Sequence, residues 1–252
     1  MSMKLLEVCV DSLTSARNAI AGGADRLELC SALIAGGLTP YVELLEQIRA
    51  ESDIPIRCLM RPRAGDFLYE AEEIDMMAKQ IKILKSAGSD GFVIGCLTPD
   101  GLLDRNAMTP LVEAAEGSGL TLHRCFDVGV GVADAMLTAA ELGIDTILTS
   151  GGAAHCLDGF ETYELMLELR DFYGNCPEIL VGAGVNADVI RTVRQKFPAI
   201  EMFHMSGKVN VPSGMTFRRE GVPMGLPGLD EWHIPTTSRE AVAAARAALY
   251  EI

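Results

Sequence analysis

The sequence lacks the features that would place it in a membrane or on nucleic acid. No apolar run approaches the roughly 18 residues that cross a bilayer. Basic residues are the minority, with 21 Lys and Arg against 35 Asp and Glu and a formal net charge of −14. Because phosphate backbones bind to basic surfaces, this balance argues against a nucleic-acid partner. We therefore expect neither a membrane nor a nucleic acid as a partner.

Signals of secretion and of disulfide or zinc frameworks are also missing. The first residues, MSMKLLEV, lead almost directly into a strand-like run, without the basic region, apolar segment and cleavage site of a secretory signal. The seven cysteines are an odd number, most of them lie in apolar runs, and none forms a C-x-x-C pair. The sequence predicts a cytoplasmic protein whose cysteines are reduced.

Short β-like runs alternate with longer amphipathic segments along the whole chain. Strands are expected at residues 4–10, 25–30, 55–61, 91–95, 120–125, 145–149, 178–182 and 201–206, and helices at 72–88, 133–143, 187–197 and from Ser238 onward. Eight such units in about 250 residues predict an α/β fold, a single (β/α)8 barrel over residues 1–252. An open doubly wound sheet is the alternative, but no G-x-G-x-x-G follows the first strand.

Two neighbouring strands each carry a glutamate two residues before a cysteine, Glu7 with Cys9 and Glu28 with Cys30. Side chains alternate between the two faces of a strand. The more apolar face of each strand should meet the helices of a barrel, which turns these four side chains toward the interior. We expect both pairs to contribute to one site.

Further polar side chains fall at the carboxyl ends of predicted strands, where barrels of this type carry their active sites. The glutamates could act as bases or metal ligands, a histidine as acid or base, and an arginine as an anion clamp. A buried structural salt-bridge network is the competing interpretation. The candidate catalytic residues are Glu7, Glu28, Arg61, His123 and Asp127.

Small residues follow the seventh and eighth predicted strands, where barrels often bind an anion through backbone N–H groups. The connection 207–235 is the longest in the chain, and we expect a functional loop or lid there. The candidate substrate- or anion-binding residues are Asp11, Arg63, Ser150, Gly151, Gly182, Gly184, His204, Ser206 and Gly207.

Six motifs in order, EVCVDS, GGADRLELCSALIAGGLTP, RPRAGDFLY, GFVIGCLTPDG, HRCFD and LTSGG, resemble the CutC family, described as copper homeostasis proteins. The resemblance covers about residues 6–152 closely and the remainder more loosely. It implies a (β/α)8 barrel, a cytoplasmic setting, a homodimer or larger homo-oligomer, and copper binding. This chain departs from the family pattern at Cys125, which is more often alanine, and at Tyr41, which is often serine.

The resemblance implies Cys9 and Cys30 as ligands of Cu(I), a soft ion that accepts two or three thiolates. The alternative for both cysteines is a buried space-filling role. Two functional hypotheses follow: a copper-binding homeostasis protein, and a barrel enzyme for a small anionic or sugar-like substrate that uses Glu7, Glu28, Arg61 and His123.

Overall fold

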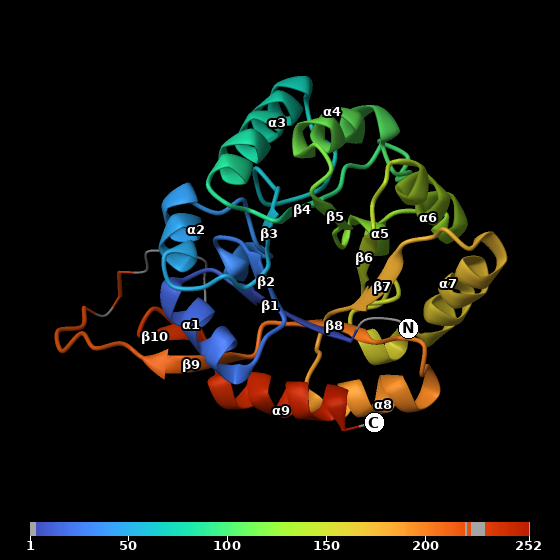
Figure 1. The fold of residues 1–252 in the computed structure, drawn as a ribbon. Coiled ribbons are helices and arrows are strands. Elements are labelled where there is room, and N and C mark those ends of the chain that lie inside the picture. Colours follow the sequence, from blue (N-terminus) through green and yellow to red (C-terminus); the bar gives the residue numbers. More distant parts are fainter. Residues whose placement is uncertain (1–3, 220, 223–229, 252) are drawn as a thin grey trace.

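Eight parallel strands close into a barrel in the computed structural model, which describes residues 4–219, 221–222 and 230–251 (Figure 1). Each strand pairs with its neighbours in sequence, and the eighth pairs with the first. The strands are β1 (Leu5–Val10), β2 (Arg26–Leu29), β3 (Ile56–Leu59), β4 (Gly91–Ile94), β5 (Gly119–Leu122), β6 (Thr146–Thr149), β7 (Glu178–Val181) and β8 (Met202–Met205). The fold class predicted from the sequence is confirmed.

Helices surround the barrel as an outer ring (Figure 1). The α-helices are α1 (Leu13–Gly22), α2 (Val42–Arg49), α3 (Ala71–Ser86), α4 (Arg105–Ala115), α5 (Cys125–Val128), α6 (Val132–Glu141), α7 (Phe160–Tyr173), α8 (Ala187–Lys196) and α9 (Arg239–Tyr250), with short 3-10 turns η1 (Leu33–Ala35) and η2 (Cys156–Asp158). Ser238 caps α9 as predicted, because its hydroxyl accepts a hydrogen bond from the Ala241 amide.

Strand alternation divides the core into two parts. Outward side chains such as Leu6, Val8 and Phe203 are fully buried and belong to the large apolar cluster shared with the helices. Inward side chains form a separate small cluster at the amino-terminal end of the barrel: Leu5, Leu148, Leu180 and Met202. This apolar layer fills the interior on the side of β1, β6, β7 and β8, whereas on the other side Arg57 bonds to Thr121 and Asp145.

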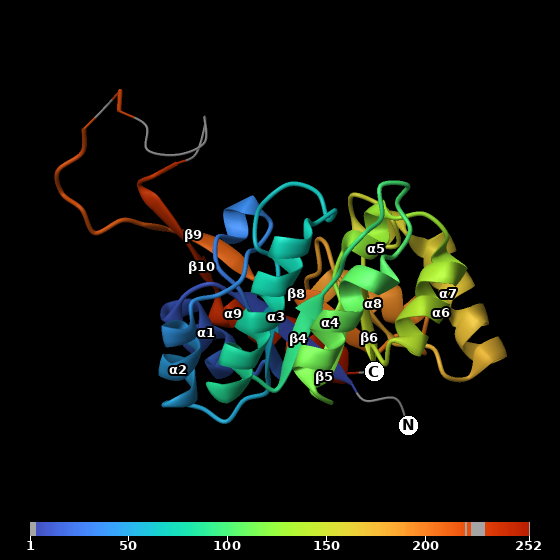
Figure 2. The same ribbon diagram turned by 90° about the horizontal axis from the view of Figure 1, so that it is seen from above.

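The connection after β8 differs from the loop expected at 207–235, because its two ends form strands. β9 (Lys208–Pro212) and β10 (His233–Thr237) pair antiparallel, with Lys208 opposite Thr237 and Pro212 opposite His233. We call the described residues between 208 and 237, namely 208–219, 221–222 and 230–237, the arm. Figure 2 shows it projecting from the barrel, and every residue of β9 is exposed. The part of the predicted loop at residues 220 and 223–229 lies outside the described residues.

Among the described residues, none of the helices has both the length and the apolar character to cross a bilayer.

Candidate functional site

Polar side chains from β1, β2 and β8 meet inside the barrel. The strand register places Glu7 beside Arg26 on one flank and His204 on the other. Two residues further along β1, Cys9 lies beside Glu28. All five side chains point inward because they share the parity that the apolar, helix-facing residues leave free.

Glu7 is fully buried and bonded on both sides. Its carboxylate accepts a hydrogen bond from Arg26 Nε at 2.6 Å, and its other oxygen lies 2.8 Å from His204 Nδ1. Burial raises the pKa of Glu7, but the charges of Arg26 and His204 outweigh it and lower the pKa to about 2. Glu7 is therefore a permanent anion that orients both neighbours. Arg26 Nη2 is buried without a hydrogen-bond partner.

Cys9, Glu28 and His204 bring a sulfur, an oxygen and a nitrogen atom within 4.8 Å of one another. His204 Nε2 lies 3.9 Å from Glu28 Oε2. Burial raises the pKa of Glu28 to about 7, since its anionic neighbour Glu7 offsets part of the attraction of His204 and Arg26. Burial lowers the pKa of His204, but Cys9, Glu28 and Glu7 outweigh it and hold that pKa well above its ordinary value.

This trio fits a transition-metal ion. Thiolate, imidazole and carboxylate ligands lie about 2.0–2.3 Å from such an ion, so atoms within 4.8 Å of one another can share it after small shifts. Because Glu7 accepts a hydrogen bond from Nδ1–H, His204 is left with Nε2 as its free ligand atom. A carboxylate behind a metal-binding histidine is a common means of fixing the ring.

Cys30 lies near this trio but is not one of its members. Its thiol is fully buried, donates to the Val10 carbonyl oxygen at 3.5 Å, and packs with Leu59 and Val93. Burial and the nearby Cys9 raise the pKa of the Cys30 thiol well above its ordinary value. A Cys9–Cys30 ligand pair stays a prediction, whereas His204, assigned from the sequence to substrate or anion binding, lies among the potential metal ligands.

Arg61 and His123 occupy a different region, at the ends of β3 and β5. Arg61 donates to the carbonyl oxygens of Ala35, Gly37 and Gly65, and it makes no ion pair with a described carboxylate. Burial, together with the Arg61 charge, lowers the pKa of His123 to about 3, so its imidazole is neutral at pH 7. The cation that pairs with Glu7 is therefore Arg26 and not the Arg61 singled out from the sequence.

Asp127 shapes the loop after β6. The sequence named it as a candidate catalytic residue just after the strand expected at 120–125, whereas β5 ends at Leu122 and Asp127 belongs to α5. Its buried carboxylate accepts hydrogen bonds from Ser150 and from the Gly152 amide, and it pairs with Arg124. These bonds hold the Ser150–Gly151 turn in place, and a catalytic role for Asp127 stays a prediction.

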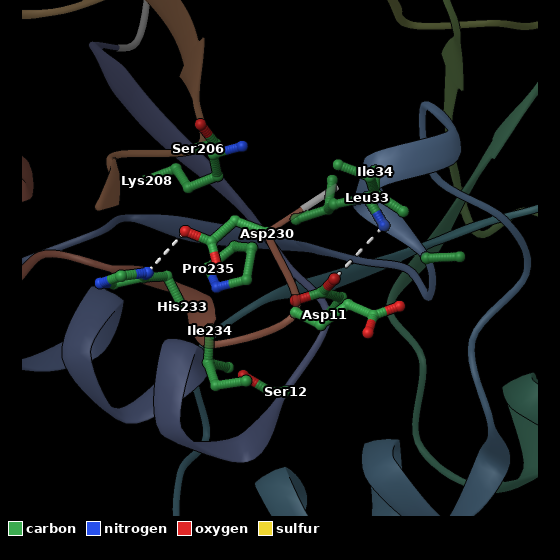
Figure 3. Close-up of a pocket in the computed structure, with 12 residues that line it drawn as sticks. Asp11, Ser12, Leu33, Ile34, Ser206, Lys208, Asp230, His233, Ile234 and Pro235 are labelled. Carbon is green, nitrogen blue, oxygen red and sulfur yellow. Dashed lines mark hydrogen bonds and ion pairs between the residues drawn. The ribbon is translucent and has the colours of Figure 1, made fainter. Parts of the chain in front are cut away.

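A pocket of about 520 Å³ covers the ends of β1 and β8 (Figure 3). Asp11 and Ser206, both named from the sequence, line it, and Asp11 accepts a hydrogen bond from the Leu33 amide at 3.3 Å. The arm supplies the opposite wall, where Asp230 bonds to His233. These two barrel residues lie two positions beyond Cys9 and His204, so the pocket lies over the buried trio.

The remaining sequence candidates lie outside this pocket lining. Arg63 pairs with Asp66 and Glu73. Gly182 packs near His204, a side chain at Gly184 would overlap the His155 ring, and Gly207 has a positive φ of 55°. An anion site formed by these glycine amides stays a prediction.

Strand parity in the sequence turned Arg26 inward without marking it as a site residue, and sequence reasoning missed Phe67 and Tyr69. Arg26 has the inward parity of β2, but only the register shows that it lies beside Glu7. Phe67 and Tyr69 lie in the connection after β3, where no periodic pattern marks which side chains turn inward.

Comparison with known proteins identifies the family of this chain. The family model described as the CutC family matches residues 4–209. CutC proteins of Vibrio campbellii and Vibrio parahaemolyticus are each 41% identical, over 94% and 97% of this chain and 96% and 98% of theirs. The solved structure of a Streptococcus agalactiae CutC, named for copper homeostasis, aligns with a TM-score of 0.75 at 27% identity over 81% of this chain and 99% of that one. The chain therefore belongs to the CutC family.

Proposed function

We propose that this protein binds a copper ion inside the barrel, with Cys9 and His204 as the main ligands and Glu28 beside them. The observation that carries the proposal is the convergence of three ligand atoms of different kinds within 4.8 Å, at a histidine oriented by Glu7. The name of the Streptococcus agalactiae relative, which refers to copper homeostasis, supports this choice of metal.

The donor set favours copper on chemical grounds. Thiolate and imidazole suit Cu(I), and divalent copper heads the affinity order of first-row ions at sites that contain nitrogen and sulfur. Glu28 is a harder ligand, so its contribution to a Cu(I) site is mainly its negative charge. Cys30, implied by the family resemblance, would supply a second thiolate if its side chain rotated away from the Val10 carbonyl.

A competition assay with a chromophoric Cu(I) chelator tests the proposal. Cys9→Ser and His204→Gln should each abolish competition by the purified protein, because each removes a soft or borderline ligand. Cys176→Ser is the matched control, since that half-buried thiol lies far along the chain after α7. Unchanged copper affinity in both site variants would overturn the proposal. Cys30→Ser then decides whether the second thiol is a ligand.

The second candidate function is catalysis on a small anionic or sugar-like substrate. The pocket of about 520 Å³ over the trio supports it, together with the pKa of Glu28 near 7, which suits a general acid or base at neutral pH. In a screen of metabolites, this function predicts that Glu28→Gln loses turnover while Cys9→Ser retains it. The opposite pattern, or no turnover of any compound, favours copper binding alone.

The setting and assembly of the protein complete the proposal. Seven free cysteines are compatible with a reducing cytoplasm, where thiols persist. A homodimer is supported by the arm, which exposes Val209, Val211 and Ile234 on a two-stranded ribbon of marginal stability by itself. A second copy of the chain would cover these side chains.

A further inference from the structure

Three buried polar atoms without hydrogen-bond partners belong to the segments that follow β3 and β5. They are Arg61 Nε, Tyr69 Oη and His123 Nε2. His123 is 4% exposed, and Arg61 and Tyr69 are 9% exposed. A buried donor without an acceptor costs about 1–3 kcal/mol, so three in one place call for an explanation.

Ring contacts and charge effects place the three side chains in one neighbourhood. The Phe67 ring lies 4.7 Å from the His123 ring, centroid to centroid, and its centroid lies 5.2 Å from Arg61 Cζ. The Arg61 charge acts on both His123 and Tyr69. Phe67 also lines a cavity of about 450 Å³ with loop residues after β3 and β4, and neither Arg61 nor His123 lines that cavity.

The unpartnered nitrogens of Arg61 and His123 are fixed as donors, and the Tyr69 hydroxyl can donate as well. The two terminal nitrogens of Arg61 are held by the carbonyl oxygens of Ala35, Gly37 and Gly65, which leaves Nε–H. His123 Nδ1 accepts a hydrogen bond from the Cys125 amide at 3.1 Å, so the neutral ring carries its proton on Nε2.

Gly95 on the neighbouring segment leaves room for this arrangement. A Cβ there would come within 2.5 Å of His123 Cε1 and would also overlap the Cys125 thiol. The imidazole can therefore keep its position only while residue 95 is glycine.

We infer that Arg61, Tyr69 and His123 bind a small oxyanion, of the carboxylate or phosphate type, beneath Phe67 and apart from the Cys9–Glu28–His204 trio. Three donors match the acceptor oxygens of such a group, and its negative charge compensates a buried guanidinium that has no carboxylate partner among the described residues. The site does not depend on copper binding.

Histidine-selective ¹⁵N NMR tests this inference, because the chain has only four histidines. Titration with sodium acetate and, separately, with inorganic phosphate should shift the His123 Nε2 resonance saturably. The anion that saturates at the lower concentration identifies the source class. Chloride at matched ionic strength is the reference, and equal shifts with all three salts would mean an adventitious ion only and overturn the site.

Tyr69→Phe and Tyr163→Phe form a matched pair of variants, since both remove a buried hydroxyl that lacks a partner. Tyr69→Phe should weaken anion binding by about tenfold, while Tyr163→Phe should leave it unchanged. Equal affinities in the two variants, or only an ordered water at the three donors in a high-resolution structure grown with the anion, would overturn the inference. Cys9→Ser should retain anion binding, so failure of the copper proposal remains distinguishable from failure of this one.

Discussion

Glu7 and Glu28 are both buried on neighbouring strands, yet their pKa values move in opposite directions. Glu7 has Arg26 Nε at 2.6 Å, and this direct bond outweighs the cost of burial. Glu28 has no such bond, and burial dominates its titration. One residue is thereby a fixed anion and the other exchanges a proton near neutral pH, which is the difference between an orienting group and a reactive one.

Replacing Glu7 should destabilise the barrel strongly. Glu7→Gln leaves Arg26 as an uncompensated buried charge, and we expect the free energy of unfolding to fall by about 3 kcal/mol. Urea denaturation followed by circular dichroism measures the change. Glu46→Gln, an exposed position on α2, is the control and should change it little. A Glu7→Gln loss no larger than that of the control would show that the ion pair contributes nothing.

His123 should make the fold sensitive to mild acid. Its pKa in the folded protein is about 3, below the ordinary 6.5, so the folded state binds fewer protons and stability falls as the pH drops from 6.5 toward 3. Between pH 6.5 and 4.5 this group alone should cost about 2 kcal/mol. Glu28 opposes the trend between 7 and 4.5, because its pKa is raised.

The comparison that isolates His123 is a variant without a titrating ring. His123→Gln should lose less stability than the parent protein between pH 6.5 and pH 4.5, as measured by urea midpoints at both values. His233→Gln in the arm should retain the parent's loss. Identical pH dependence in His123→Gln and the parent would contradict the assignment.

Among the elements, the loop after β6 depends on a glycine more than a typical helix end does. Gly151 and Gly143 have the same φ of 74°, but a Cβ on Gly143 would meet nothing within 4 Å, whereas on Gly151 it would overlap the Gly159 backbone. We expect Gly143→Ala to cost about 1 kcal/mol from backbone strain alone, and Gly151→Ala to cost about 2 kcal/mol more from the clash. Equal shifts in the urea midpoint would contradict this.

The sequence predicts the strands and their inward faces because alternation in a barrel is a local property. Glu7, Cys9 and Glu28 were placed together in this way. Partner choice was not predictable: Arg26 and His204 flank Glu7 through the register of β1 with β2 and β8, and β8 lies at the other end of the chain. Cys125 was assigned to a strand, but the His123 ring bonds to the Cys125 amide and the chain turns into α5 there.

At the scale of the whole molecule, the segment 208–219 of the arm is basic, whereas the chain as a whole is acidic. Residues 208–219 include Lys208, Arg218 and Arg219 and no Asp or Glu, although the protein has a net charge of −14. A second copy of the chain would offer this basic segment an acidic surface. It would also bury the exposed apolar residues of the arm.

This assembly gives a direct prediction in solution. The parent protein should sediment as a dimer in analytical ultracentrifugation, and Val211→Asp should shift it toward monomer, because Val211 and Ile234 are paired, exposed apolar residues of the ribbon. Phe172→Asp on α7, where the side chain is 80% exposed, is the control and should remain dimeric. A monomeric parent protein, or dissociation caused by Phe172→Asp alone, would rule out the arm as the interface.

The pairing of Lys208 with Thr237 allows the arm to vary in length and sequence independently of the barrel. The two ends of the arm are adjacent. Ser238 caps α9 immediately after the arm, and α9 packs against α1 and α8. Chain inserted between those ends costs little closure entropy, which grows only slowly with length. The arm is therefore the part of this protein that evolution, or an engineer who grafts in a foreign domain, can lengthen, shorten or replace while the barrel stays the same.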